Sequence, residues 1–352
     1  MSPLKVFANP HCVAHGWYWA LPAAQLAPMQ KKELKLFGKT LLLFRTPQGS
    51  VHAVQAYCPH MGAHLEAGHV DETGIRCGFH GWKFGIDGRC LQVPCQELET
   101  FRVAEKFGMI WIHTDASSND PLPDFPDLKN NAVSVRIDVV ERRACHPTLI
   151  LGGGVDEEHF LFVHRKTTAA SGPLCFEHQR LSPQVIHFKN CARLICGPAV
   201  STSNTTTTDA ITTPAHPPQK PTFQQRMQHK IMRALYGNVL RYEVTYWSAS
   251  TACAQLGPAW FPLYSIFAYR PSAEGGTEGL NIYVTPKHKG LRGFVSVFAL
   301  AITRLILRGG GKEDAVIQNR IRFAVGPYTL SNPAFSAFVN YVEEQPVLEL
   351  KQ

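Results

Sequence analysis

The chain has 352 residues, of which 45% are hydrophobic and 18% charged, so it can bury a sizeable core and is not a disordered protein. Lys and Arg (35) outnumber Asp and Glu (27), and the net charge is +8. No basic run with interleaved aromatic residues predicts a nucleic-acid groove, so DNA and RNA are not expected partners, whereas an acidic protein partner is. Ten cysteines in a long chain that opens on Met1-Ser2-Pro3, without a secretion signal, favour a reducing cytoplasm over a disulfide framework.

The first part of the chain, to about residue 115, predicts a small all-β unit. Strand candidates are the segments 34–37, 41–44, 51–54 and 109–112, separated by glycine-containing turns. A proline-rich connector over residues 121–126 marks the best boundary. We therefore expect one domain over residues 1–120 and a second over residues 121–352.

The strongest motif in this first part consists of two short loops, each with one cysteine and one histidine. Cys58-Pro59-His60 is followed after 16 residues by Cys77-Gly78-Phe79-His80. A [2Fe–2S] cluster of the Rieske kind requires this set, with two Cys on one iron and two neutral His on the other. A zinc site is the alternative metal reading, although zinc motifs usually pair like ligands. Unrelated Cys/His pairs in turns are the non-functional alternative.

The sequence around these loops resembles the ring-hydroxylating oxygenase branch of the Rieske proteins. The resemblance rests on Cys58-Pro59-His60-Met61-Gly62-Ala63, Cys77-Gly78-Phe79-His80-Gly81-Trp82-Lys83-Phe84 and Gly88-Arg89-Cys90. Respiratory Rieske proteins have an extra Cys in each loop, where this sequence has Ala63 and Phe79. Since the chain continues far beyond the length of a Rieske ferredoxin, the resemblance implies a second, mononuclear Fe(II) site. It also implies an α+β fold, in which the Rieske domain precedes a catalytic domain with an antiparallel sheet flanked by helices.

A candidate for part of the second site follows the triple glycine at residues 152–154. Non-haem Fe(II) oxygenases hold iron with two His and one carboxylate and leave the opposite positions open. His159 and His164 supply the imidazoles, within a segment predicted to be helical over residues 155–164. Five residues correspond to about 140° around a regular helix, so both would reach one ion only with a local widening or kink.

The remaining roles come from the resemblance. The third iron ligand is expected far downstream at the start of a helix, where Asp314 fits best and Glu313 is the alternative. If this pair binds no metal, its two carboxylates would simply stabilise the N-terminus of the helix. In trimers of this family, a carboxylate placed like Asp156 connects an iron-ligand His to a cluster His of the neighbouring subunit. The alternative for Asp156 is a carboxylate at a helix N-terminus.

Three other segments of the second half bear on partners and substrate. Residues 201–221, rich in Thr and Pro, predict a long loop. Residues 224–236 predict a basic amphipathic helix, and residues 294–307 form an apolar stretch that carries Arg304 and is short for a membrane span. Both could pack on the core or touch a membrane surface, so peripheral membrane contact and an apolar substrate are hypotheses. A helix is also expected over residues 312–323, directly after a second triple glycine.

These features predict an oxygenase component that hydroxylates or oxidatively demethylates an organic, apolar aromatic or polycyclic substrate with O₂. Electrons from NAD(P)H would arrive through a separate reductase or ferredoxin, because no Gly-rich dinucleotide motif is present. A homotrimer is the expected assembly. The alternatives are a Rieske electron carrier without oxygenase activity and a zinc-stabilised binding module.

Overall fold

The computed structural model describes residues 4–125, 128, 132–156, 158–159, 163, 176–193, 239–256, 262–324 and 330–350. In the first part it contains short strands and two 3-10 turns: β1 (Cys12–Ala14), β2 (Trp17–Pro22), η1 (Ala23–Gln25), β3 (Lys31–Leu36), β4 (Lys39–Arg45), β5 (Val51–Gln55), η2 (Leu65–Ala67), β6 (His69–Asp71), β7 (Gly74–Arg76), β8 (Lys83–Gly85), β9 (Thr100–Phe101), β10 (Val103–Lys106) and β11 (Met109–His113). The second part contains β12 (Val133–Ile137), β13 (Glu141–Arg143), α1 (Pro147–Gly152), β14 (Phe176–Ser182), β15 (Val185–Arg193), β16 (Val239–Trp247), β17 (Thr251–Gln255), β18 (Tyr264–Pro271), β19 (Thr277–Pro286), α5 (Gly290–Gln318), α6 (Pro333–Glu343) and β20 (Val347–Glu349).

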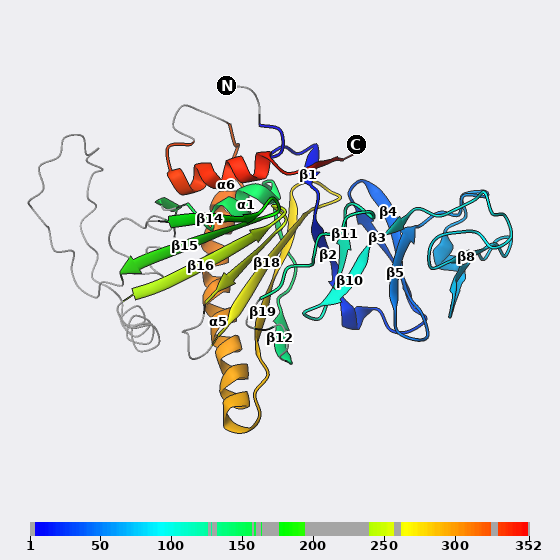
Figure 1. The fold of residues 1–352 in the computed structure, drawn as a ribbon, viewed down its shortest axis with the longest axis horizontal. Coiled ribbons are helices and arrows are strands. Elements are labelled where there is room, and N and C mark those ends of the chain that lie inside the picture. Colours follow the sequence, from blue (N-terminus) through cyan, green and yellow to red (C-terminus); the bar gives the residue numbers. More distant parts are fainter. Residues whose placement is uncertain are drawn as a thin grey trace, which may run out of the picture.

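The predicted strands of the first part are confirmed. The four segments fall within or overlap β3, β4, β5 and β11. The turn between β3 and β4 has positive φ at Phe37 (56°) and Gly38 (70°), as a tight hairpin requires. Figure 1 shows the predicted α+β class, with an all-β unit beside a large antiparallel sheet that carries helices.

The strands form one large sheet and several small ones. The large sheet has eight strands in the order β12–β19–β18–β17–β16–β15–β14, with β13 also paired to β19. The first part contains the sheets β10–β11–β2, β3–β4–β5–β9 and β6–β7–β8. β1 pairs with β20, so segments near the two ends of the chain lie side by side.

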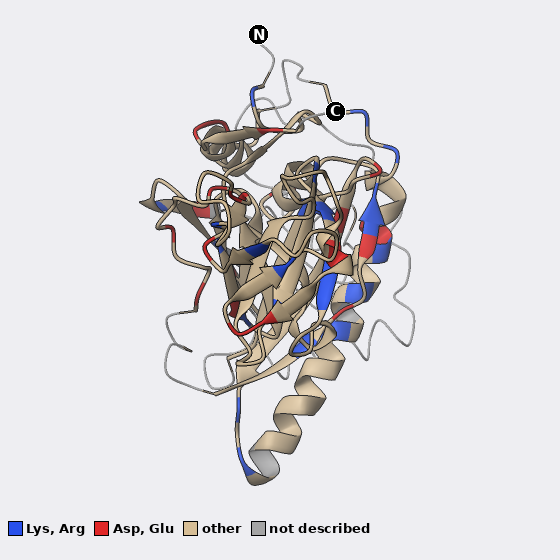
Figure 2. Ribbon diagram, turned by 90° about the vertical axis from the view of Figure 1, so that its right-hand side faces the viewer, with Lys and Arg blue, Asp and Glu red and all other residues tan. Residues whose placement is uncertain are grey.

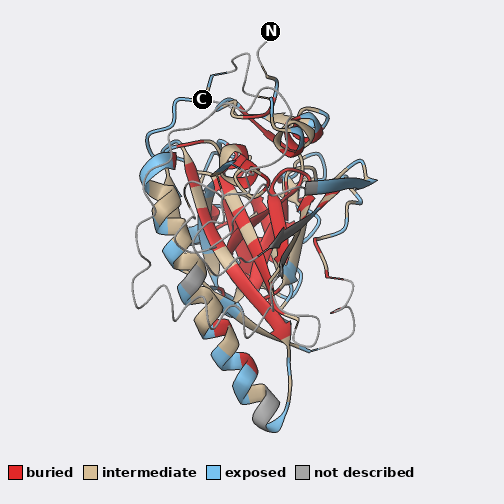
Figure 3. Ribbon diagram, turned by 90° about the vertical axis from the view of Figure 1, so that its left-hand side faces the viewer, coloured by how far each residue is buried: buried red, intermediate tan, exposed pale blue. Residues whose placement is uncertain are grey.

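The large sheet is covered on both faces, because neighbouring residues of a strand point to opposite sides. Ile266 of β18 shares a core with Trp111, so this face packs against the β10–β11–β2 sheet. Phe267, the next residue, packs on the opposite core with Phe338 of α6 and Leu151 of α1. Figure 3 shows the buried strands of the sheet from the side of these helices.

The connection between the two parts is tightly packed. The guanidinium of Arg270 donates to the carbonyls of Trp19 and Ala20 (2.9 Å each), lies 3.6 Å from the Trp19 ring centroid, and pairs with Glu278 (3.0 Å). Phe125 of the proline-rich connector stacks near Tyr264 of β18, with ring centroids 4.3 Å apart. Side chains of the first part, the connector and the large sheet therefore share one hydrophobic core.

Two predictions about helices are wrong in part. The glycines at 309–311 do not precede a helix but lie inside α5, where Arg143 Nη2 donates to the carbonyl of Gly311 (3.0 Å). Tertiary packing thus overrides the low helix propensity of glycine. Of the helix expected over residues 155–164, only 158 and 159 are helical among the described residues, and α1 instead ends at the triple glycine.

The apolar stretch at 294–307 belongs to a longer helix than expected. Within α5, the segment Gly293–Gln318 is long and apolar enough to cross a membrane by length and composition, and little of its most apolar part is buried. The expectation that this stretch is too short is therefore corrected. The Asp138 side chain, only 6% exposed, ties α5 to the sheet by pairing with Arg304 (2.5 Å) and Arg308 (2.9 Å).

Candidate metal centres

Cys58 and Cys77 begin two loops with the same backbone hydrogen bonds. The N–H of each cysteine donates to the carbonyl five residues later (2.9 and 2.8 Å). The N–H four residues later, at Gly62 and Gly81, donates back to the cysteine carbonyl (2.9 and 3.1 Å). Both glycines have φ near +70°, a conformation that side chains with a Cβ rarely adopt. The two loops thus explain why the sequence repeats a Cys, a nearby His and a glycine.

The four predicted cluster side chains lie together, with the thiols inside and the imidazoles outside. Cys58 and Cys77 are buried, and the neighbouring Cys77 thiol contributes to the raised pKa of Cys58. His60 and His80 are exposed, with ring centroids 4.6 Å apart. Trp82 stacks on the His60 ring at 4.3 Å and 5°, which orients that imidazole.

This arrangement fits a [2Fe–2S] cluster with one Cys-bound and one His-bound iron. Burial raises the pKa of the Cys58 thiol, while a hydrogen bond from the backbone of His60 opposes the shift. Because the cluster binds thiolates, its insertion must release the protons of both cysteines. The exposed imidazole side is the edge through which electrons can enter or leave.

The second centre joins two residues that lie 155 positions apart. His159 Nε2 lies 2.8 Å from Asp314 Oδ1, and both side chains are about one-fifth exposed. Two ligand atoms bound about 2.1 Å from one divalent ion at a right angle lie about 3 Å apart, so this pair fits two positions of a facial site. The contact is made by Asp314, the preferred residue of the adjacent acidic pair.

The expected helix start at Asp314 is wrong, because this residue lies near the C-terminal end of α5. The packing of α5 across the sheet brings the carboxylate to His159. Asp156 lies close by, where its Oδ1 accepts a hydrogen bond from the backbone N–H of His159 (3.2 Å). This is the contact of a helix-capping carboxylate, and it holds the backbone of the candidate ligand.

The triple glycine lets His159 approach the loop backbone closely. A Cβ at Gly153 would lie 2.9 Å from His159 Nδ1, and a Cβ at Gly154 would lie 2.5 Å from Tyr246 Oη. Tyr246 donates to the carbonyl of Leu151 (2.9 Å), so it anchors the end of α1 to the sheet. The glycines are therefore explained by close packing at the site rather than by a helix start.

Sequence reasoning missed the tyrosines beside this centre. Tyr242 and Tyr246 lie on the same face of β16, near Gly154. Their separation by an even number of residues in a strand could have predicted that they share this face. Burial raises the pKa of Tyr269, and the carboxylate of Asp314 adds to the shift, which places this phenol in the electrostatic field of the site. At neutral pH these tyrosines are neutral groups that can donate a proton in a hydrogen bond.

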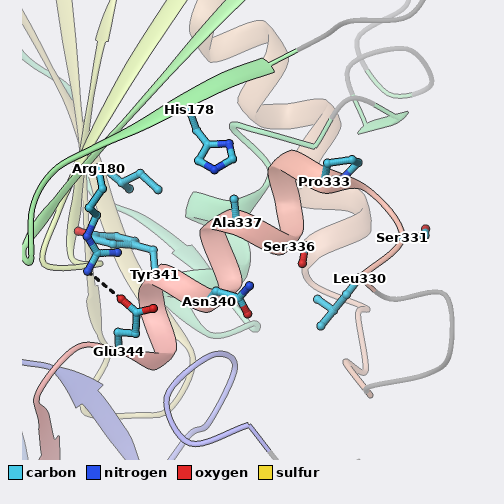
Figure 4. A pocket seen from close by; sticks show the side chains of 11 residues that line it. His178, Arg180, Leu330, Ser331, Pro333, Ser336, Ala337, Asn340, Tyr341 and Glu344 are labelled. Atoms are coloured by element: carbon cyan, nitrogen blue, oxygen red, sulfur yellow. Dashed lines mark ion pairs between the residues drawn. The ribbon is translucent and has the colours of Figure 1, made fainter.

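Some predicted site residues lie outside the described part of the chain, including His164, the loop at 201–221 and the helix at 224–236. Figure 4 shows a cavity of about 620 Å³ between β14 and α6, where Arg180 pairs with Glu344 (3.1 Å) and lies over the Tyr341 ring. Neither His159 nor Asp314 lines this cavity. It is therefore separate from the candidate iron ligands.

The two centres lie on opposite sides of the large sheet. The cluster loops belong to the part that packs on the Ile266 face, whereas the His159 loop follows α1 on the Phe267 face. Within one chain the large sheet therefore lies between the two centres.

Comparison with known proteins identifies the first of these units. Residues 16–102 match the family model of the Rieske [2Fe–2S] domain, which includes both loops. Over 161 residues the chain is 33% identical to the 3-chlorobenzoate-3,4-dioxygenase oxygenase subunit of Comamonas testosteroni, covering 42% of this chain and 37% of that protein. It is 32% identical over 127 residues to the 4beta-methylsterol monooxygenase of Methylococcus capsulatus, covering 32% of this chain and 34% of that protein. The matched region thus spans little more than a third of these relatives.

The complete fold has counterparts among solved structures. Dicamba monooxygenase bound to dicamba superimposes with a TM-score of 0.60 at 17% identity, covering 97% of this chain and 98% of that chain. NdmA of Pseudomonas putida CBB5 superimposes with a TM-score of 0.61 at 16% identity, covering 93% and 88%. The chain therefore contains a Rieske [2Fe–2S] domain and has the overall fold of these two structures, which bears out the predicted resemblance.

Proposed function

We propose that this chain is the oxygenase component of a Rieske non-haem iron system. The contact between His159 and Asp314 carries the proposal, because an electron carrier needs no second His–carboxylate site behind its sheet. His159, His164 and Asp314 would hold a mononuclear Fe(II), which when bound supplies the O₂-activating chemistry. The division into a Rieske domain (1–120) and a catalytic domain (121–352) is part of this proposal.

The chain's own residues would hold and orient the ligands. The backbone hydrogen bond to Asp156 and the close approach of Gly153 restrict the His159 imidazole, so that its Nε2 faces Asp314. The buried Tyr246 and the partly buried Tyr269 pack in the core that holds the end of α1, where they would limit the entry of water. A dry, ordered site of this kind protects a reactive centre from side reactions.

Electrons would come from a ferredoxin or flavin reductase that uses NAD(P)H and docks at the exposed His60–His80 edge. Because the large sheet separates the two centres of one chain, transfer between neighbouring subunits is favoured, and we propose a homotrimer. Asp156 would connect His159 or His164 to a cluster histidine of the next subunit, through the carboxylate that also caps the His159 backbone. A cytoplasmic location remains a prediction.

The proposed substrate is an apolar aromatic or polycyclic compound that is hydroxylated or oxidatively demethylated. Two relatives are named for sterol substrates, the 4beta-methylsterol monooxygenase and the cholesterol 7-desaturase of Ciona intestinalis, and a third is named for 3-chlorobenzoate. Each match covers less than half of this chain. They support the reaction class more strongly than any one substrate.

The test is a count of iron and acid-labile sulfide after anaerobic purification, with EPR of the reduced protein. We expect three irons and two sulfides per chain and the low average g value of a His-ligated cluster. Asp314→Asn should lower the count to two irons and leave the cluster spectrum unchanged, whereas the matched Glu313→Gln should keep three. Two irons that Fe(II) reconstitution does not raise would indicate an electron carrier, and zinc without sulfide would indicate a binding module.

A further inference from the structure

The N-terminal half of α5 exposes an apolar stripe. Phe294 and Phe298 are 72% and 60% exposed, and Ala301 and Leu305 continue the same face at helical spacing. Figures 1 and 2 show that this end of the helix projects beyond the sheet. We infer that this projecting end docks on a lipid surface that carries anionic headgroups, with Phe294 and Phe298 inserted among the acyl chains.

The charges next to the stripe along the chain have one sign, and Asp138 pairs with two of them, Arg304 and Arg308. From residue 279 to residue 312 the chain contains six Lys or Arg and no Asp or Glu. Lys287 and Lys289, both exposed, stand directly before the helix. Apolar side chains flanked by lysines are the arrangement by which helices bind the interface of an anionic membrane. A symmetric contact between two copies of this face would instead bring like charges together.

The helix contacts the membrane through its projecting N-terminal half and does not cross it. Its opposite side is buried against the sheet through Leu300, which packs with Leu263 and Tyr283. Arg304 and Arg308, in the middle of the apolar segment Gly293–Gln318, pair with Asp138. A span would have to break these contacts and place two arginines in hydrocarbon.

Docking has a consequence for the proposed function. Phe298 and Asp314 belong to one helix, and 16 residues correspond to about 24 Å. The site would then stand within about 24 Å of the inserted Phe298 and would accept an apolar substrate from the lipid. Only this consequence rests on the proposed oxygenase activity; the docking does not.

Vesicle flotation with the full-length holoprotein tests the inference. We expect binding to vesicles of phosphatidylcholine with phosphatidylglycerol, weakened by salt, and little binding to phosphatidylcholine alone. F294E/F298E should lose more than about tenfold in binding, because two large apolar side chains no longer insert. K287E/K289E should lose the preference for the anionic vesicles.

The matched control is M29E/L181E, which changes the charge equally at two other exposed apolar residues and should bind like the wild type. Absence of vesicle binding, or equal losses in F294E/F298E and the control, would overturn the inference. A wild-type oligomer that only F294E/F298E dissociates, without vesicle binding, would assign the face to a second copy. Because flotation needs no turnover, a protein that floats but keeps only two irons after Fe(II) reconstitution would refute the oxygenase proposal alone.

Discussion

Replacing Gly153 by alanine tests the packing that positions the candidate iron ligand His159. A Cβ at this position would lie 2.9 Å from Nδ1 and 3.0 Å from Cε1 of the imidazole. Ordinary contacts begin at about 3.4 Å, so the ring or the loop must move by about 0.5 Å. Gly153 has φ −57° and ψ −23°, which alanine adopts freely, so the effect is purely steric. Overpacking of this size costs about 1–3 kcal/mol.

The assay combines urea unfolding with the ratio of iron to acid-labile sulfide. We expect G153A to lower the free energy of unfolding by about 1–3 kcal/mol and to reduce mononuclear iron while the cluster spectrum persists. The matched control is G309A in α5, where a Cβ meets no atom within 4 Å. Alanine there should stabilise the helix by up to about 1 kcal/mol. Wild-type stability together with full mononuclear iron in G153A would refute the proposed crowding of His159.

Three further predictions address the capping carboxylate, the link between the two parts and a buried histidine. D156N keeps an oxygen that accepts the His159 N–H, so the free energy of unfolding should change little. Electron delivery from the cluster should slow, as measured by reoxidation of the reduced cluster in a single turnover. A wild-type rate would contradict the bridging role. R270M should lower the free energy of unfolding by about 3–5 kcal/mol, because Glu278 loses its buried partner. R270K should not restore the wild-type free energy of unfolding. A change below about 1 kcal/mol in urea unfolding would show that this link is unimportant. Burial lowers the pKa of His146 to about 4, whereas the pKa in the unfolded state is about 6.5. Between these values the unfolded state binds one more proton, so the contribution of His146 to the free energy of unfolding is complete only above about pH 6.5. It should fall by on the order of 3 kcal/mol as the pH drops from about 6.5 to 4, and H146N, compared by urea unfolding across that range, should lack this part of the slope.

The sequence by itself determined the cluster-binding unit. Each loop closes on itself through hydrogen bonds between residues four and five positions apart, so Cys, His and glycine must recur at short, readable spacing. The same locality made the strands around it predictable from alternation and turns. His159 could be proposed because Asp156, His159 and His164 repeat a spacing found in the family that the sequence resembles.

Only the tertiary structure decided how the second centre is assembled. Glu313 and Asp314 are adjacent, and on a helix they point about 100° apart, so the packing of α5 on the sheet selects the one that meets His159. The start of α5 was also decided by packing, since Asp138 and Arg304 hold a helix whose glycines would otherwise favour a break. Local pattern determines a site built within one loop, whereas a site built across 155 residues depends on which faces the whole core buries together.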